Sequence, residues 1–168
     1  LYRLVCILNT PTILLILAGT LVLTNSFVSC SSIDCPINTR TSCVFSLAGD
    51  TLTDTLTIST TRRDGSDTVL VNRQTGISVF SVPMSYDGTT DELLFDRKYA
   101  DTSSTLDTVT IEKDNTPHFE AVDCNPAFFH TLKSVSTTHH GIDSLSILNP
   151  NVTFDNSHAN IQIFFKKH

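Results

Sequence analysis

The sequence predicts an all-β domain, an antiparallel β-sandwich of about eight or nine strands, with an open β-barrel as the alternative architecture. Short segments in which apolar residues alternate with Thr, Ser or charged residues recur along the chain, as expected for strands that bury one face. Clusters of Gly, Pro, Asn and Asp separate these segments and are typical of turns. No window of about 11 residues after Cys30 carries the apolar stripe of an amphipathic helix. Strands without helices imply a sandwich or a barrel.

The strand pattern occurs in nine segments, and five of these begin with an Asp that precedes alternating apolar residues. In chain order the segments are 43–47, 54–58, 67–71, 77–82, 91–95, 107–111, 128–135, 143–147 and 161–165. We expect the apolar residues of each segment to face one core. We expect the Asp to end the preceding turn through backbone hydrogen bonds and not to act as a catalytic carboxylate. The uneven spacing of the segments excludes a solenoid or a propeller.

Composition and charge limit the class of protein. The chain has 168 residues and a formal net charge of -6, which fits a single domain. Hydrophobic residues make up 40% of the chain, enough to bury a core. The acidic balance and the lack of clustered Lys and Arg argue against nucleic acid as the partner, because phosphate binding depends on such clusters.

The first 29 residues have the pattern of a secretory leader. No charged residue occurs from Leu4 to Ile33, and residues 13–23 are almost entirely apolar. This apolar stretch fits the roughly 7–15 residues of a signal-peptide core and is shorter than the ~20 residues that span a bilayer. We therefore expect export of the chain from the cytoplasm.

Residues 27–30 resemble a bacterial lipobox, in which the Cys is lipidated and becomes the first residue after cleavage. Val28 and the small Ser29 fit the pattern, whereas Phe27 stands where Leu is usual. The resemblance implies a lipoprotein signal peptide over 1–29, a lipidated tether over 30–41 that begins at Cys30, and a single β domain over 42–168. The alternatives are an ordinary secretory signal cut near Ser29 and an uncleaved anchor with an unmodified Cys30.

The residues after Cys30 indicate in which membrane a lipidated chain would be anchored. Ser31, Ser32 and Ile33 include neither an Asp next to the Cys nor an acidic run, so the lipoprotein marks for inner-membrane retention and for surface export are both missing. We therefore expect an outer-membrane protein that faces the periplasm. Its membrane contact would be the lipid anchor, which is effectively permanent when several acyl chains are attached.

The number and sequence contexts of the cysteines predict a disulfide. Besides Cys6 and Cys30, the chain has Cys35, Cys43 and Cys124. Cys35 and Cys124 both lie in turn-like Asp-Cys contexts close to Pro, so a bond between them would tie the tether to the domain. Cys43 lies in an apolar segment and is expected to be a buried thiol, although a bond between Cys43 and Cys124 stays open. No CxxC motif occurs, which excludes zinc ribbons and thioredoxin-like sites.

Several segments are similar to an uncharacterised family of Bacteroidetes envelope proteins, catalogued as a domain of unknown function. The similarity is carried by residues 31–36, 71–73, 83–86, 122–130 and 142–144, above all by Val122-Asp123-Cys124-Asn125-Pro126. It extends over nearly all of the chain after Cys30. The resemblance implies a lipoprotein of the cell envelope and implies no catalytic residues.

One polar cluster has the composition of a functional site. His118, Asp123 and His130 lie close to Cys124 in the sequence and are the residue types of a Cys-His nucleophile or a metal site. We favour the simpler interpretation, polar residues around a disulfide. The chain has neither an HExxH nor a GxSxG motif. We therefore expect no catalytic residues, no metal and no cofactor.

These observations predict a lipid-anchored binding or structural module of the cell envelope that is not an enzyme, with another envelope protein as a candidate partner. One alternative is a carrier that holds an apolar small molecule in a β-barrel, which requires a deep apolar cavity. A second alternative is a hydrolase with a Cys/His or Ser/His site, which requires His118 or His130 within hydrogen-bond reach of a nucleophile.

Overall fold

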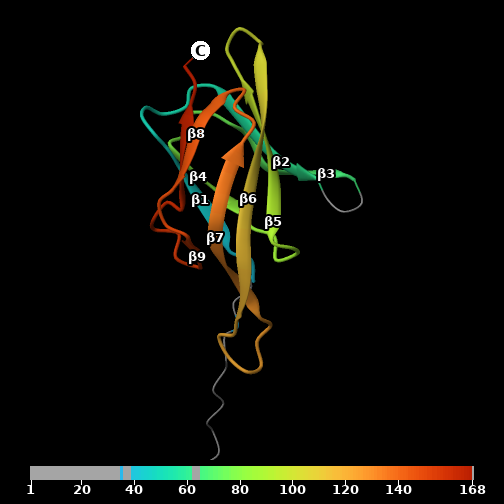
Figure 1. The fold of residues 1–168 in the computed structure, drawn as a ribbon. Helices are drawn as coiled ribbons and strands as arrows, with labels where there is room; N and C mark the ends of the chain where they lie inside the picture. Colours follow the sequence, from blue (N-terminus) through green and yellow to red (C-terminus); the bar gives the residue numbers. More distant parts are fainter. Residues whose placement is uncertain (1–34, 36–38, 62–64, 168) are drawn as a thin grey trace, which may run out of the picture. The chain divides into compact units, whose positions relative to one another are not determined.

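Ten strands in two sheets form the domain, as a computed structural model shows for residues 35, 39–61 and 65–167 (Figure 1). The four-stranded sheet has the order β4-β1-β10-β8. It consists of β1 (Ser42–Leu47), β4 (Val79–Pro83), β8 (Ile142–Ile147) and β10 (Ile161–Phe165). The six-stranded sheet has the order β3-β2-β5-β6-β7-β9. It consists of β2 (Thr55–Thr61), β3 (Asp67–Gln74), β5 (Thr90–Lys98), β6 (Ser104–His118), β7 (Ala127–Thr137) and β9 (Asn151–Val152).

The predicted all-β class is confirmed, since the described residues contain strands and no helix. One of the sheets is curled into a half-barrel, which makes the fold sandwich-like with barrel character. Two details differ from the prediction. The two-residue strand β9 is too short to show an alternating pattern in the sequence. The pair β1–β10 is parallel, with Phe45 opposite Ile161, whereas every other pair of neighbouring strands is antiparallel.

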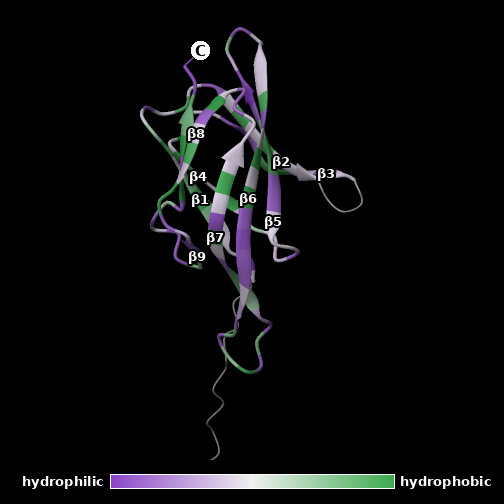
Figure 2. Ribbon diagram, viewed as in Figure 1, coloured by the Kyte–Doolittle hydropathy of each residue, from purple (hydrophilic) through white to green (hydrophobic). Residues whose placement is uncertain are grey.

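The core lies between the two sheets. Three aromatic rings meet there: Phe45 from β1, Phe80 from β4 and Phe95 from β5. The rings of Phe45 and Phe80 are stacked with centroids 5.1 Å apart, and Phe95 meets Phe45 edge-on at 5.9 Å. Such packed and offset rings stabilise a core beyond the area that they bury. Hydrophobic and hydrophilic residues alternate along β7 and β8, whereas the part of β6 towards the loop 119–126 is hydrophilic throughout (Figure 2).

The β6–β7 hairpin extends beyond the rest of the sheets and ends in the loop 119–126 (Figure 1). Strand β6 has 15 residues and β7 has 11, which makes both longer than the strands beside them. The chain just before β1 runs along this hairpin, with Arg40 in a parallel bridge to Phe128. The hydroxyl of the buried Thr41 donates a hydrogen bond to the Phe128 carbonyl at 2.8 Å. The last residues of the predicted tether are therefore docked onto β7.

Two of the five Asp residues that open the strand pattern are buried, which corrects their interpretation as turn residues. Asp107 lies inside β6, opposite Phe95. Its carboxylate accepts the backbone N–H groups of Gly141 at 2.6 Å and Ile142 at 2.9 Å. Asp107 thereby ties β6 to the start of β8 in the other sheet. The second buried residue is Asp91 in β5. The partners of both come from distant strands, which local periodicity does not reveal.

Candidate functional site

The two histidines of the predicted polar cluster lie on opposite faces of the β6–β7 hairpin. His118 is paired with Ala127, and His130 is paired with Asn115. Because side chains alternate along a strand, residues three positions apart on β6 point to different faces. The two imidazoles therefore do not share a catalytic or metal site. In the ranges that the structure describes, no group of three His, Cys, Asp or Glu residues could hold a metal ion.

His118 and Asp123 of this cluster lie at the surface. The ring of His118 stacks on Phe129 with centroids 4.2 Å apart, and its Nε2 lies 3.0 Å from Glu120 Oε1. Asp123 is exposed in the loop between β6 and β7. These contacts resemble the polar surroundings of a disulfide more than a nucleophile with its base.

The disulfide joins Cys35 to Cys124, as predicted. Their Cα atoms are 5.4 Å apart and the two residues are separated by 89 positions in the sequence. The bond attaches the segment before β1 to the loop at the end of the β6–β7 hairpin. The alternative bond from Cys43 to Cys124 does not form, because Cys43 is a free thiol.

Cys43 lies inside the domain and has no exposed area. Burial, followed by the charge of the nearby Asp91 carboxylate, raises the pKa of the Cys43 thiol to about 12. The thiol is therefore protonated at neutral pH, and a protonated thiol is a poor nucleophile. Cys43 is accordingly a core residue, as its apolar sequence context indicates.

A buried ion pair joins β5 to β6. Lys113 follows Val109 and Ile111 on the inward-facing side of β6, and its side chain has no exposed area. Its Nζ lies 3.2 Å from Asp91 Oδ1 and donates to the Gly88 carbonyl at 3.3 Å. Burial raises the pKa of Asp91, while Lys113 and a backbone N–H oppose this shift. A charged pair inside a domain persists only with such compensating partners.

His130 lies beside this pair and is also buried. Its Nδ1 lies 2.7 Å from Asn115 Oδ1. The Asn115 amide nitrogen donates to the carbonyls of Tyr86 and Gly88, so its oxygen must be the acceptor and His130 donates from Nδ1. Burial, followed by the charge of Lys113, lowers the pKa of His130 to about 4. The imidazole is therefore neutral at pH 7 and is a fixed part of the polar network.

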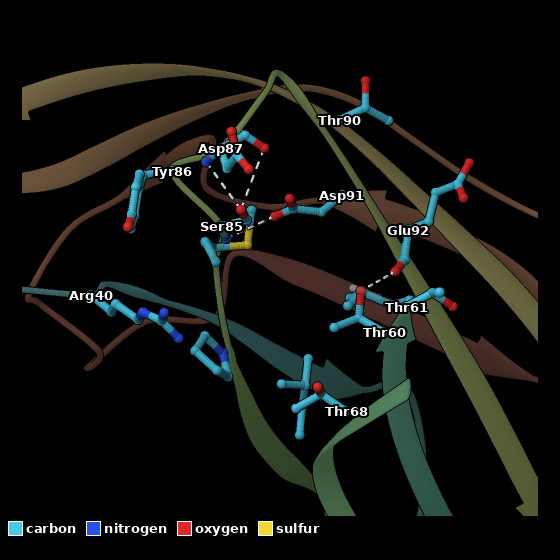
Figure 3. A pocket seen from close by; sticks show the side chains of 14 residues that line it. Arg40, Thr60, Thr61, Thr68, Ser85, Tyr86, Asp87, Thr90, Asp91 and Glu92 are labelled. Atoms are coloured by element: carbon cyan, nitrogen blue, oxygen red, sulfur yellow. Dashed lines mark hydrogen bonds between the residues drawn. The ribbon is translucent and has the colours of Figure 1, made fainter. Parts of the chain in front are cut away.

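The Asp91 carboxylate connects this network to a cleft of about 600 Å³. The cleft is formed by the end of β2, the start of β3, the end of β4 with the loop that follows it, and the start of β5. Its hydroxyl-bearing residues are Thr60, Thr61, Thr68, Ser85, Tyr86 and Thr90. Figure 3 shows Arg40 and Tyr86 on one side of the cleft and Thr60, Thr61 and Thr68 on the other.

Two cleft residues are held in place by the structure behind them. Asp91 Oδ2 accepts the backbone N–H of Ser85 at 3.2 Å, while Oδ1 faces Lys113. The ring of Tyr86 stacks on Phe128 with centroids 5.2 Å apart, yet 54% of Tyr86 stays exposed. The cleft thus combines an ordered carboxylate, a supported aromatic ring and several hydroxyl groups.

Sequence reasoning missed both Asp91 and Lys113 as site residues. A signal for Lys113 exists, because the alternation of Val109 and Ile111 continues to position 113 and places a Lys on the inward face. Its partner could not be named, since Asp91 becomes adjacent only when β5 pairs with β6.

Comparisons with known proteins give one match. Residues 55–165 match the model of a family described as a family of unknown function (DUF6452). No curated protein and no solved structure matches the chain. Among the described residues, no helix is long and apolar enough to cross a membrane.

Proposed function

This chain belongs to the family of unknown function DUF6452, and we propose that it is a lipid-anchored binding module of the bacterial cell envelope that binds glycan chains in the cleft beside Asp91. The proposal has two parts, the anchor and the ligand site. Each rests on its own observations and has its own experiment.

The anchor is supported by the N-terminal sequence. The uncharged residues 4–33 and the lipobox-like Val28-Ser29-Cys30 favour export and lipidation at Cys30. The predicted signal peptide 1–29 and residues 30–34 and 36–38 of the predicted tether lie outside the described residues. The Cys35–Cys124 disulfide is consistent with an oxidising compartment such as the periplasm. We propose the outer membrane, facing the periplasm, as the location.

The ligand site is supported by one observation above all, a cleft that has threonine hydroxyl groups on one side and the exposed ring of Tyr86 on the other. Hydroxyl groups both donate and accept hydrogen bonds, which matches the mixed donors and acceptors of a sugar. The ring of Tyr86 offers an apolar face for the C–H groups of a pyranose, with its phenol at the edge. Concave sites with a few placed polar groups are the usual form of ligand pockets.

The charges of the cleft favour an uncharged glycan. Asp91 is compensated by Lys113, while Asp87 and Glu92 add negative charge and Arg40 adds positive charge. Ionised carboxylates only accept hydrogen bonds, and sugar hydroxyls are suitable donors to them. Counted formally, Arg40 offsets one of these two carboxylates, and the remaining excess of one negative charge disfavours an acidic polysaccharide.

Binding without catalysis is the function that these groups support best. Cys43 is buried and protonated, and His130 is held as a donor to Asn115. The packed rings of Phe45, Phe80 and Phe95 occupy the space between the sheets, which favours the cleft over an apolar carrier cavity as the ligand site.

The glycan site is tested by titrating the purified protein with soluble neutral oligosaccharides, chitohexaose and maltohexaose, in a calorimeter. We expect binding of at least one of them and a loss of about tenfold in affinity for Tyr86→Ala, equivalent to ~1.4 kcal/mol. Leu106→Ala, at an exposed position on β6 outside the cleft, serves as the control and should bind normally. Absence of binding to both sugars, or equal affinity of Tyr86→Ala, would overturn the glycan site.

The anchor is tested by mass spectrometry of the protein purified from the membranes of a Gram-negative host. We expect a wild-type chain that begins at Cys30 and carries acyl groups, and a Cys30→Ala variant that carries none. A wild-type chain that keeps residues 1–29 or bears no acyl group would overturn the anchor and leave the cleft unaffected.

A further inference from the structure

The loop 119–126 at the end of the β6–β7 hairpin exposes two large apolar side chains. Phe119 is 61% exposed and Val122 is 99% exposed. Single exposed apolar residues are common on proteins and need no explanation by themselves. These two, however, lie together in the loop that ends the hairpin projecting from the sheets (Figure 1). Whether Phe119 and Val122 form a contact surface depends on what this loop faces.

The disulfide attaches this loop to the segment that follows Cys30 in the sequence. Cys124 lies in the loop, two residues after Val122, and is bonded to Cys35. Cys35 is only five residues after Cys30, and five residues can span at most about 17 Å even when fully extended. This step rests on the proposed lipidation of Cys30. If Cys30 carries the anchor, the loop 119–126 stays within a short, covalently limited distance of the lipid headgroups.

We propose that the loop 119–126 is a membrane-contact surface that inserts Phe119 and Val122 into the lipid bilayer to which Cys30 is anchored. The acyl chains supply the attachment, and the loop sets the orientation of the domain on the membrane. Because the anchor confines the loop near the bilayer, its effective concentration there is high and a weak intrinsic affinity is sufficient. Apolar and aromatic side chains in this setting partition into the headgroup and acyl boundary.

The surroundings of the loop favour a lipid surface as the occupant. Behind the loop, His118 stacks on Phe129 with centroids 4.2 Å apart, and Phe154 meets Phe129 edge-on at 5.3 Å. This cluster supports the end of the hairpin. Glu120 Oε1 lies 3.0 Å from His118 Nε2. The loop has no Lys or Arg and two carboxylates, Glu120 and the exposed Asp123, so the contact would depend on burial of Phe119 and Val122 and not on attraction to anionic headgroups.

The sequence allows a clean test, because the chain contains no Trp. We would introduce Val122→Trp or Phe119→Trp as the only Trp in the full lipidated protein. Leu106→Trp is the matched control, since Leu106 is 54% exposed. Leu106 lies on β6 near the end away from the loop, and at ~3.3 Å per residue it is about 40 Å from His118, where the loop begins. Each protein is first shown by mass spectrometry to carry acyl groups. It is then reconstituted into phosphatidylcholine vesicles with and without brominated acyl chains.

We expect brominated lipids to quench the fluorescence of the Val122→Trp and Phe119→Trp proteins at least twofold more than that of the Leu106→Trp protein, with a blue-shifted emission only in the loop variants. Exchange of both disulfide cysteines for Ser in the Val122→Trp protein should reduce this quenching, because the loop is no longer held near the anchor. An acylated Val122→Trp protein quenched no more than the Leu106→Trp protein overturns the membrane contact and leaves the anchor standing. A protein without acyl groups overturns the anchor, and the membrane contact with it.

Discussion

Lys113 and Asp91 form an ion pair inside the domain, with Lys113 Nζ 3.2 Å from Asp91 Oδ1 and no exposed area on the Lys113 side chain. The pair lies between the aromatic core and the polar cleft. Asp91 is the residue that both regions share, since it also lines the cleft. The stability of the core and the shape of the cleft are therefore expected to depend on the same two charges.

Removing one charge of this pair should be costly. In Lys113→Met the carboxylate of Asp91 stays buried without its partner, and we expect the free energy of unfolding at pH 7 to fall by about 3–5 kcal/mol. Urea denaturation measures the change. The control is the double variant Asp91→Leu with Lys113→Met, which removes both charges and should recover much of the loss. A Lys113→Met protein as stable as the wild type would contradict the buried pair.

His130 should make stability depend on pH. The pKa of His130 is lowered to about 4 by burial and by Lys113. An unfolded chain protonates this residue below about pH 6.5, whereas the folded chain does not do so until about pH 4. The free energy of unfolding should therefore fall by about 3 kcal/mol as pH drops through this window.

The variant His130→Gln tests this dependence. Gln can still donate to Asn115 but does not titrate, so its stability should change less between pH 7 and pH 4.5 than that of the wild type. Urea denaturation at the two pH values gives the difference. The titration of Asp91 is common to both proteins and largely cancels in the comparison. Equal pH dependence of the two proteins would argue against a buried neutral His130.

The strands were predictable because a half-buried strand leaves a local signal. The alternation at 54–58 and 107–111, for example, marks segments that the structure places in β2 and β6. The Cys35–Cys124 bond was also predictable, since both residues lie in turn-like contexts while Cys43 lies in an apolar run. In each case the information is contained in a few neighbouring residues.

The cleft and the ion pair were not predictable because they depend on strand order. Thr68 on β3, Ser85 after β4 and Asp91 on β5 meet only because the chain crosses between the two sheets. The role of Asp107 was not predictable for the same reason. Its partners Gly141 and Ile142 are more than thirty positions away in the sequence, so its role as a buried acceptor leaves no local pattern.

Asp107 should be intolerant even of a small change. It accepts three backbone N–H groups and the Thr138 hydroxyl. Burial alone would raise the pKa of Asp107, but these donors outweigh it and the pKa is lowered. Asp107→Asn would place an NH₂ group against N–H donors, and we expect a loss of about 2–3 kcal/mol.

Thermal or urea denaturation measures this loss, with the exposed Asp143→Asn on β8 as the control. Because a lowered pKa stabilises the fold above the ordinary pKa of Asp, the difference between wild type and Asp107→Asn should shrink as the pH falls into the acid range. A difference that grows on acidification would be the opposite of the expected sign.

The Cys35–Cys124 disulfide should contribute most of its stability through the unfolded chain. Its two residues are separated by 89 positions, and closing a loop of this length is worth about 4–5 kcal/mol in the chain-entropy estimate. Addition of a reductant should therefore lower the urea midpoint of the wild type. The double variant Cys35→Ser with Cys124→Ser should have the lower midpoint from the start, and the reductant should not change it. Cys43 does not confuse the measurement, because it is free in both proteins. A wild-type midpoint that does not move on reduction would show that the docked segment around Thr41 holds the hairpin without the covalent bond.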